Sequence, residues 1–138
     1  MPFTRLFYHL IWTTRNRLPL ITPQIEARLF RNLAQTAGEL GCRVLAVNGL
    51  EDHVHLVIEI SPRLAVATVV TRLKGAGSRD FSDLYWQRGY GALTIEERDL
   101  HAALDYVERQ KEHHSLQTAI ARLERCDDGA DLESTDAP

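Results

Sequence analysis

The 138-residue chain is 44% hydrophobic and 25% charged, with a formal net charge of −3. This length and composition fit one soluble domain with a hydrophobic core and are too short for two. No apolar run reaches the roughly 18 to 20 residues of a membrane helix, and the first residues lack a signal-peptide layout. The two cysteines, Cys42 and Cys126, cannot form a disulfide framework. We therefore expect a cytoplasmic protein with no membrane partner.

The charge is distributed unevenly along the chain. Six of the 19 acidic residues but only one of the 16 basic residues lie from Glu124 onward, which leaves 13 acids and 15 bases before it. A short acidic segment without aromatic residues is typical of disorder. We expect a single domain over residues 1–123 and an acidic, disordered tail over residues 124–138. Net charge neither supports nor excludes a nucleic-acid partner.

The predicted elements alternate between strands and helices. Segments dense in aromatic and β-branched residues indicate strands, and apolar residues at helical spacing behind an N-cap or proline indicate helices. In chain order we expect a strand at residues 6–14, a helix at 23–40, strands at 43–50 and 53–60, a helix that begins at 62, a strand or extended segment at 85–93 and a helix from 94 to about 113. Asn48 and Gly49 indicate a hairpin, and Thr94 with Glu97 forms a capping box.

This order, β-α-β-β-α-β-α, predicts an α+β fold with a ferredoxin-like (RRM-like) antiparallel sheet. We expect the helices on one face of the sheet. The other face would then be open for a ligand, a partner chain or nucleic acid, although the fold alone does not decide the function.

His53 and His55 begin the strand predicted at residues 53–60. Side chains of a strand alternate between faces, so Val54, Leu56 and Ile58 form an apolar core side and the histidines point the other way. We expect the two imidazoles side by side on the open face, where they could hold one metal ion or one phosphate. The alternative is two exposed polar residues on a solvated face, and two ligands do not complete a metal site.

Tyr106 lies away from the apolar stripe of the last predicted helix. Leu100, Leu104 and Val107 mark that stripe, whereas Tyr106 lies about 200° from Leu104 around the helix. Gln110 stands one turn further on, on the side of Tyr106. We expect an accessible tyrosine ring; a half-buried tyrosine with its hydroxyl in water is the alternative.

Together these segments resemble the small HUH transposases of the IS200/IS605 group, including the REP-associated tyrosine transposases. The resemblance covers roughly residues 6–114, and Val54 is the bulky hydrophobic residue between the two histidines. The segments that carry it, in order, are YHLIWTTRNR, EDHVHLVIEI, LKGAGSR, WQRGYGAL and YVERQKEHH.

The resemblance implies cleavage and rejoining of single-stranded DNA. In that scheme His53, His55 and Gln110 bind a divalent cation, Mg²⁺ or Mn²⁺, and Tyr106 attacks the scissile phosphate to give a 5′-phosphotyrosine and a free 3′-hydroxyl. It also implies recognition of hairpin DNA. The family is usually a homodimer in which the tyrosine helix of one subunit completes the histidine site of the other, although REP-associated members are often monomers.

Five basic residues are candidates for contacts with DNA phosphates. Arg15 and Arg17 follow the first strand, and Arg72, Lys74 and Arg79 flank the exposed side of the second helix. Ordinary solvated charge is the alternative for each of them.

Three other functions stay open at this point. The chain could be a non-catalytic module that binds single-stranded nucleic acid, a metal-dependent hydrolase in which Tyr106 is incidental, or a domesticated relative of the transposases. Sheets that bind nucleic acid without chemistry usually present stacking aromatic residues in their central strands, whereas this one presents histidines. A tyrosine also suits strand transfer, because its hydroxyl, with a pKa of about 10, is a reasonable leaving group.

Overall fold

The computed structural model describes residues 2–115 and 121–126 of the chain. Its centre is a four-stranded antiparallel sheet with the strand order β2-β3-β1-β4, which confirms the predicted α+β fold. The strands are β1 (Phe7–Thr13), β2 (Arg43–Leu50), β3 (His53–Glu59) and β4 (Gly91–Ile95). The helices are α1 (Pro23–Glu39), α2 (Val66–Asp80), α3 (Leu100–Glu108) and α4 (Gln110–Ser115), with short 3-10 turns η1 (Arg15–Arg17), η2 (Glu97–Asp99) and η3 (Ala121–Glu124).

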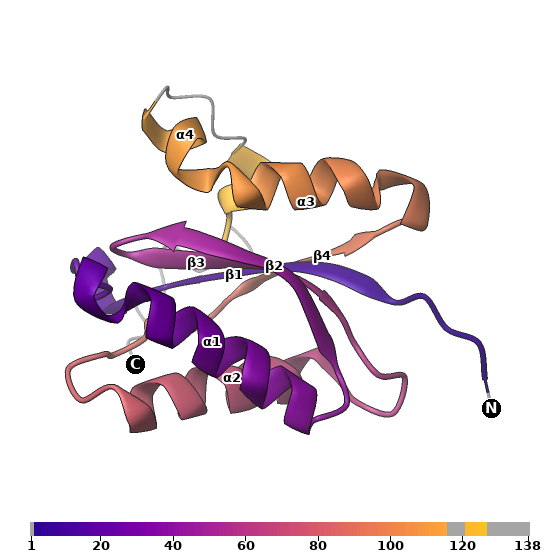
Figure 1. Ribbon diagram of the computed structural model, residues 1–138, viewed down its shortest axis with the longest axis horizontal. Helices are drawn as coiled ribbons and strands as arrows, with labels where there is room; N and C mark the ends of the chain where they lie inside the picture. The colour runs from indigo at the N-terminus through magenta and orange to yellow at the C-terminus, as the bar shows by residue number, and fades with distance from the viewer. Residues whose placement is uncertain (1, 116–120, 127–138) are drawn as a thin grey trace.

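Helices α1 and α2 cover one face of the sheet (Figure 1). That face carries Val54, Leu56 and Ile58, all fully buried, as the alternation along β3 predicts. Leu29 of α1 and Leu73 of α2 are fully buried in the same cluster. The main hydrophobic core therefore lies between this helical layer and the sheet.

The opposite face is not open, so the prediction that the helices share one face is wrong. Figure 1 shows α3 and α4 above the sheet, on the side away from α1 and α2. Val107 of α3 packs against Ala46 and Val57 in a second, smaller apolar cluster. Val57 shares a face with the two histidines, and an apolar side chain on that face requires a cover.

The hairpin between β2 and β3 turns at Glu51 and Asp52. Asn48 and Gly49 do not form the turn, because they pair with His55 and Val54 inside the ladder. The Asn-Gly pair therefore predicted the antiparallel pairing of the two strands correctly and the position of the turn wrongly.

Two helix starts also differ from the sequence prediction. The segment after β3 first makes a turn, in which the Leu64 N–H bonds the Ser61 carbonyl, and α2 begins only at Val66. Thr94 pairs with Tyr8 within β4, so the predicted capping box does not form. Residue 109 then separates α3 from α4, which brings the end of the helix back over the sheet. No helix among residues 2–115 and 121–126 is long and apolar enough to cross a membrane.

Candidate active site

His53 and His55 lie on the predicted face of β3 but are not exposed. Their side chains are 1% and 0% exposed, and they lie against Tyr106 of α3, Gln110 of α4 and Glu124 of η3. The prediction of a display on an open face is therefore wrong. The two rings lie 5.2 Å apart between centroids and are nearly perpendicular, so the predicted side-by-side pair is present inside a covered site.

The orientation of His53 is determined by the turn that precedes β3. Its Nδ1 lies 2.8 Å from Oδ1 of Asp52, and Arg17 Nε donates to the other oxygen of Asp52 at 3.1 Å. Burial acts to raise the pKa of Asp52, but the hydrogen bond from His53 and the charge of Arg17 outweigh it and lower that pKa. An ionised Asp52 accepts only, so Nδ1 carries the proton and the Nε2 of a neutral His53 presents a lone pair to the site.

Gln110 meets that lone pair. It is fully buried at the start of α4, and its Oε1 lies 3.2 Å from His53 Nε2. Its amide nitrogen has no hydrogen-bond partner among the described residues. Two acceptor atoms that face each other in a buried site favour a cation between them. Rotation of the amide would instead let its nitrogen donate to His53.

His55 is held from both sides. Its Nδ1 lies 2.7 Å from Nε2 of His9 on β1, and its Nε2 lies 2.9 Å from Oε1 of Glu124. Burial lowers the pKa of His55. Burial and then the neighbouring His55 lower the pKa of His9 to about 4. Both rings are therefore neutral at pH 7. If His55 Nε2 binds a cation, its proton leaves, the proton of His9 Nε2 moves to His55 Nδ1 and His9 takes up a proton at its own Nδ1, so both rings stay neutral.

Tyr106 is 6% exposed, which overturns the expectation of an accessible ring. The ring stacks on His113 of α4, with centroids 4.4 Å apart. Its hydroxyl donates a 2.5 Å hydrogen bond to Oε2 of Glu124. The turn between α3 and α4 thus brings the tyrosine and Gln110 to the histidines of the same chain.

Glu124 is the residue that the sequence analysis missed. It was assigned to the tail, yet its Oε1 lies 2.9, 3.3 and 3.6 Å from the Nε2 atoms of His55, His114 and His53. Burial acts to raise the pKa of Glu124, but hydrogen bonds from His55 and Tyr106 and the charge of the histidines lower it to about 2. Residues 127–138, the remainder of the predicted tail, lie outside the described residues.

This donor set fits a divalent metal ion. His53, His55, His114 and Glu124 each offer one ligand atom, and these four atoms lie within 4.8 Å of one another. Imidazole nitrogens and a carboxylate oxygen suit borderline cations such as Mn²⁺ better than Mg²⁺, which prefers oxygen ligands. The facing acceptors of His53 and Gln110 support the same conclusion.

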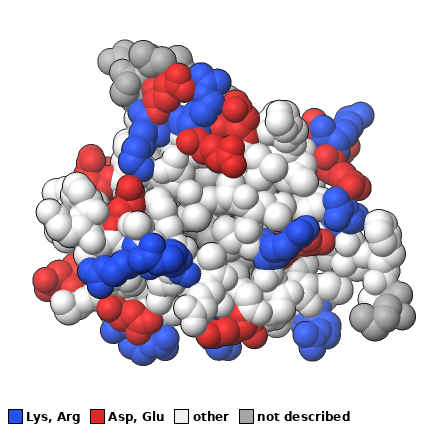
Figure 2. Space-filling view, in the orientation of Figure 1, with Lys and Arg blue, Asp and Glu red and all other residues white. Residues whose placement is uncertain are grey.

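The five predicted DNA-contacting residues fall into two groups. Arg15 and Arg17 lie in η1, at the end of β1 that faces His53. Arg72, Lys74 and Arg79 lie on α2, in the other layer. Lys74 is only partly available, because its Nζ donates to the carbonyls of residues 87 and 89. Lys and Arg are interspersed with Asp and Glu on the face seen in Figure 2, so no large basic patch is visible there.

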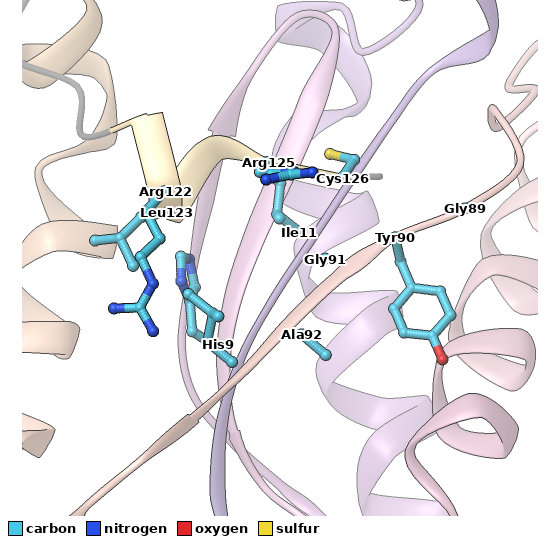
Figure 3. A pocket seen from close by; sticks show the side chains of 11 residues that line it. His9, Ile11, Gly89, Tyr90, Gly91, Ala92, Arg122, Leu123, Arg125 and Cys126 are labelled. Atoms are coloured by element: carbon cyan, nitrogen blue, oxygen red, sulfur yellow. The ribbon is translucent and has the colours of Figure 1, made fainter. Parts of the chain in front are cut away.

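A cavity of about 400 Å³ opens beside the site, between β4 and the segment around η3. Figure 3 shows His9 and Arg122 on one side of it and Gly89 and Tyr90 on the other. Because His9 bonds to His55, this cavity is one residue away from the candidate metal ligands.

Comparisons with known proteins show which family the chain resembles. A family model described as "Transposase IS200 like" matches residues 2–110. The ISDra2 transposase TnpA of Deinococcus radiodurans is 29% identical over 118 residues, covering 77% of this chain and 84% of its own. The transposase of insertion sequence element IS200 from Salmonella typhimurium is 24% identical over 121 residues, covering 79% of each chain.

Two solved structures share the fold. The crystal structure of a putative transposase from Deinococcus radiodurans matches with a TM-score of 0.63 and 26% identity, covering 79% of this chain and 93% of that one. A REP-associated tyrosine transposase bound to a REP hairpin matches with a TM-score of 0.64 and 12% identity, covering 86% of this chain and 73% of that one. Since the family model matches most of the chain, the protein belongs to the family of IS200-like transposases.

Proposed function

We propose that the protein cleaves and rejoins single-stranded DNA through a covalent bond between Tyr106 and a 5′-phosphate. The observation that carries the proposal is a shared carboxylate. Glu124 accepts the hydroxyl of Tyr106 at one oxygen and contacts His55 at the other, so the nucleophile lies beside the candidate metal ligands. A tyrosine in that position supports nucleophilic attack on a bound phosphate.

His53, His55 and Gln110 would hold the divalent ion, Mg²⁺ or Mn²⁺. When bound, such an ion supplies positive charge that polarises the non-bridging oxygens of the scissile phosphate. The protein side chains orient the ligands: Asp52 holds His53 and His9 holds His55. Neutral imidazoles and an amide would leave the charge of the ion available to the phosphate.

In the proposed step the Tyr106 oxygen forms a bond to phosphorus as the bond to the 3′-oxygen breaks. The DNA then carries a free 3′-hydroxyl, and the other end is held as a 5′-phosphotyrosine. The link keeps the energy of the phosphodiester because the tyrosyl oxygen is itself a good leaving group. Attack by a second 3′-hydroxyl then rejoins the strands without a nucleotide cofactor.

The partner we propose is hairpin DNA with an unpaired segment at the cleavage site. One structural relative is bound to a REP hairpin, and single-stranded segments are usually recognised through their bases and backbone together. Arg15 and Arg17 would contact phosphates near the histidines, and Arg72 and Arg79 would contact them from the opposite layer.

A single chain contains the whole proposed site, because Tyr106 and Gln110 reach the histidines of their own chain. Cleavage within one subunit therefore needs no exchange of helices. A homodimer with shared sites stays a prediction from the resemblance, and the concentration dependence of cleavage tests it.

The test is incubation of the protein with an end-labelled hairpin oligonucleotide and Mn²⁺, followed by a denaturing gel. We expect a covalent protein–DNA adduct that is absent in Tyr106→Phe and reduced at least a hundredfold in His53→Ala. Tyr8→Phe is the matched control, because Tyr8 pairs with Ile58 and packs against the main core, on the face of the sheet away from the histidines.

The outcomes separate the candidate functions. An adduct in Tyr106→Phe would show that another residue is the nucleophile. Cleavage without an adduct in the wild type would favour a metal-dependent hydrolase, and hairpin binding without cleavage would favour a non-catalytic module or a domesticated relative.

A further inference from the structure

The segment of residues 121–126 crosses the sheet next to the histidines. It packs against β1 and β4, and its Glu124 reaches His114 near the end of α4. Leu123 and Arg122 of this segment form one wall of the cavity in Figure 3. The segment therefore borders the site on the side of β4, next to Tyr106 of α3.

Two glycines allow this close approach. A Cβ added at Gly91 would overlap the carbonyl oxygen of Arg125, and one at Gly89 would lie 3.3 Å from the carbonyl of Cys126. Gly89 also has a φ of +90°, which other residues rarely adopt. Because Gly89 and Gly91 have no side chains, the backbone of residues 125 and 126 can lie directly against β4 and the turn before it. We call this contact surface the glycine seat.

The seated segment places Glu124 among the imidazoles. Ligands about 2.1 Å from one metal ion, at right angles to each other, lie about 3.0 Å apart. The distances from Glu124 Oε1 to His55 and His114 are 2.9 and 3.3 Å, and that to His53 is 3.6 Å. These separations are close to those of atoms that share one ion. All four candidate ligand atoms lie within 4.8 Å of one another, so the ring nitrogens would draw together when the ion binds.

We infer that Glu124 and His114 are further ligands of the metal centre, and that Glu124 also positions the nucleophile by holding the hydroxyl of Tyr106. This inference rests on the proposed function and deepens it. One carboxylate would then link metal binding to the position of the tyrosine, since Oε1 faces the imidazoles and Oε2 accepts from Tyr106. In this arrangement residues 121–126 belong to the active site, because they contribute Glu124 to it.

The donor set has a consequence for the choice of metal. A centre with three imidazoles and one carboxylate favours Mn²⁺ over Mg²⁺ more strongly than a centre with two imidazoles and one amide. His114 lies close enough to join it, with its ring centroid 4.9 Å from that of His53.

The experiment measures Mn²⁺ binding to the full chain without DNA, by electron paramagnetic resonance. We expect Glu124→Ala and His114→Asn each to weaken Mn²⁺ binding at least tenfold. Glu97→Ala and His101→Asn are the matched controls, because both residues are exposed and lie outside the site. Both should bind Mn²⁺ as the wild type does.

A second variant changes only the surface on which residues 121–126 lie and leaves every ligand residue unsubstituted. Gly91→Ala should lift residues 121–126 and weaken Mn²⁺ binding as Glu124→Ala does. Gly75→Ala is its control, because a Cβ there meets nothing within 4 Å. At saturating Mn²⁺, adduct formation by Glu124→Ala should still be at least tenfold slower, because Glu124 no longer holds the hydroxyl of Tyr106.

Unchanged or tighter Mn²⁺ binding by Glu124→Ala, or faster adduct formation, would overturn the inference, since Glu124 would then compete with the metal or the phosphate. Metal binding that depends on Glu124 in a protein that forms no adduct would support the ligand assignment and reject the proposed function. The metal-binding measurement therefore tests the ligand assignment, and the gel tests the proposed function independently of it.

Discussion

The two faces of the sheet are both buried, but only one of them is apolar. On the face under α1 and α2, the buried side chains of β1 and β3 are hydrocarbon or indole. On the face under α3, α4 and η3 they include three histidines. The buried groups of the first face are Leu10, Trp12, Val54, Leu56 and Ile58, and those of the second are Phe7, His9, Ile11, Thr13, His53, His55 and Val57.

This difference separates stability from function within single strands. Burial of apolar surface stabilises the fold directly, whereas burial of a polar group costs free energy unless it is hydrogen-bonded. On the second face each histidine has such a partner, in Asp52, Glu124 or another histidine. That face therefore holds a pre-arranged set of ligands and contributes less to the stability of the fold per residue buried.

The largest expected effect concerns neighbouring residues of β3. Leu56→Ala should lower the free energy of unfolding by about 2 to 5 kcal/mol, because it leaves a cavity in the main core. Val57→Ala should cost about 1 to 2 kcal/mol, since it removes less hydrocarbon from the smaller cluster with Ala46 and Val107. Urea unfolding of both variants measures the difference.

Mn²⁺ binding by the same two variants sharpens the contrast. Val57 shares the face of the ligands. When both variants are measured under conditions in which they are folded, Val57→Ala should therefore weaken Mn²⁺ binding more than Leu56→Ala does. If the two variants lose equal stability and bind Mn²⁺ with equal affinity, stability and metal binding are not separated between the two faces of the sheet.

Strand alternation is the part of this arrangement that sequence alone could predict. It separated Val54, Leu56 and Ile58 from His53 and His55 correctly, since side-chain direction in a strand is a local property. The same rule applied to β1 would have placed His9 on the histidine face, because His9 and Val57 are paired residues. That signal was present and unused.

The cover of the second face was not predictable in the same way. It comes from residues 100–115 and 121–126, which follow β3 by more than 40 positions, and no local pattern reports a contact over that distance. Charge counting placed Glu124 in a tail, yet its charge is satisfied by the histidines. Tyr106 was correctly placed off the apolar stripe, but a residue off the stripe is exposed only if nothing else covers it.

A second, smaller effect is the response of stability to acid. The folded-state pKa of His9 is about 4, below its ordinary value of 6.5, because of burial and then the neighbouring His55. The unfolded chain therefore takes up this proton first, and stability falls as the pH drops from 6.5 to 4, by up to about 3 kcal/mol. Above pH 6.5 this contribution is fully present.

His9→Gln should flatten that part of the curve of unfolding free energy against pH, with urea unfolding between pH 4 and 7 as the measurement. Glu124 acts in a different window. Its folded-state pKa of about 2 lies below the ordinary 4.5, so its contribution is lost only as the pH falls from 4.5 to 2. An unchanged slope between pH 6.5 and 4 in His9→Gln would mean that His9 is not the group responsible.

The smallest expected effect compares the basic residues of the two layers. Arg15 follows Thr13, the partner of His53 in the sheet, and stacks over the ring of Tyr85 at 5.6 Å. Arg72 is exposed on α2, whose buried side faces the main core, so its side chain points away from the histidine face. Each phosphate contact to a single strand contributes about 0.7 to the slope of log affinity against log salt. Arg15→Ala should reduce the magnitude of this slope by about 0.7, and Arg72→Ala should reduce it by less than half as much. The measurement is hairpin binding followed by fluorescence anisotropy at salt concentrations of about 50 to 300 mM. Equal losses would place DNA on both layers, because only a hairpin that wraps around the edge of the sheet could contact Arg72 and still present its scissile phosphate to Tyr106.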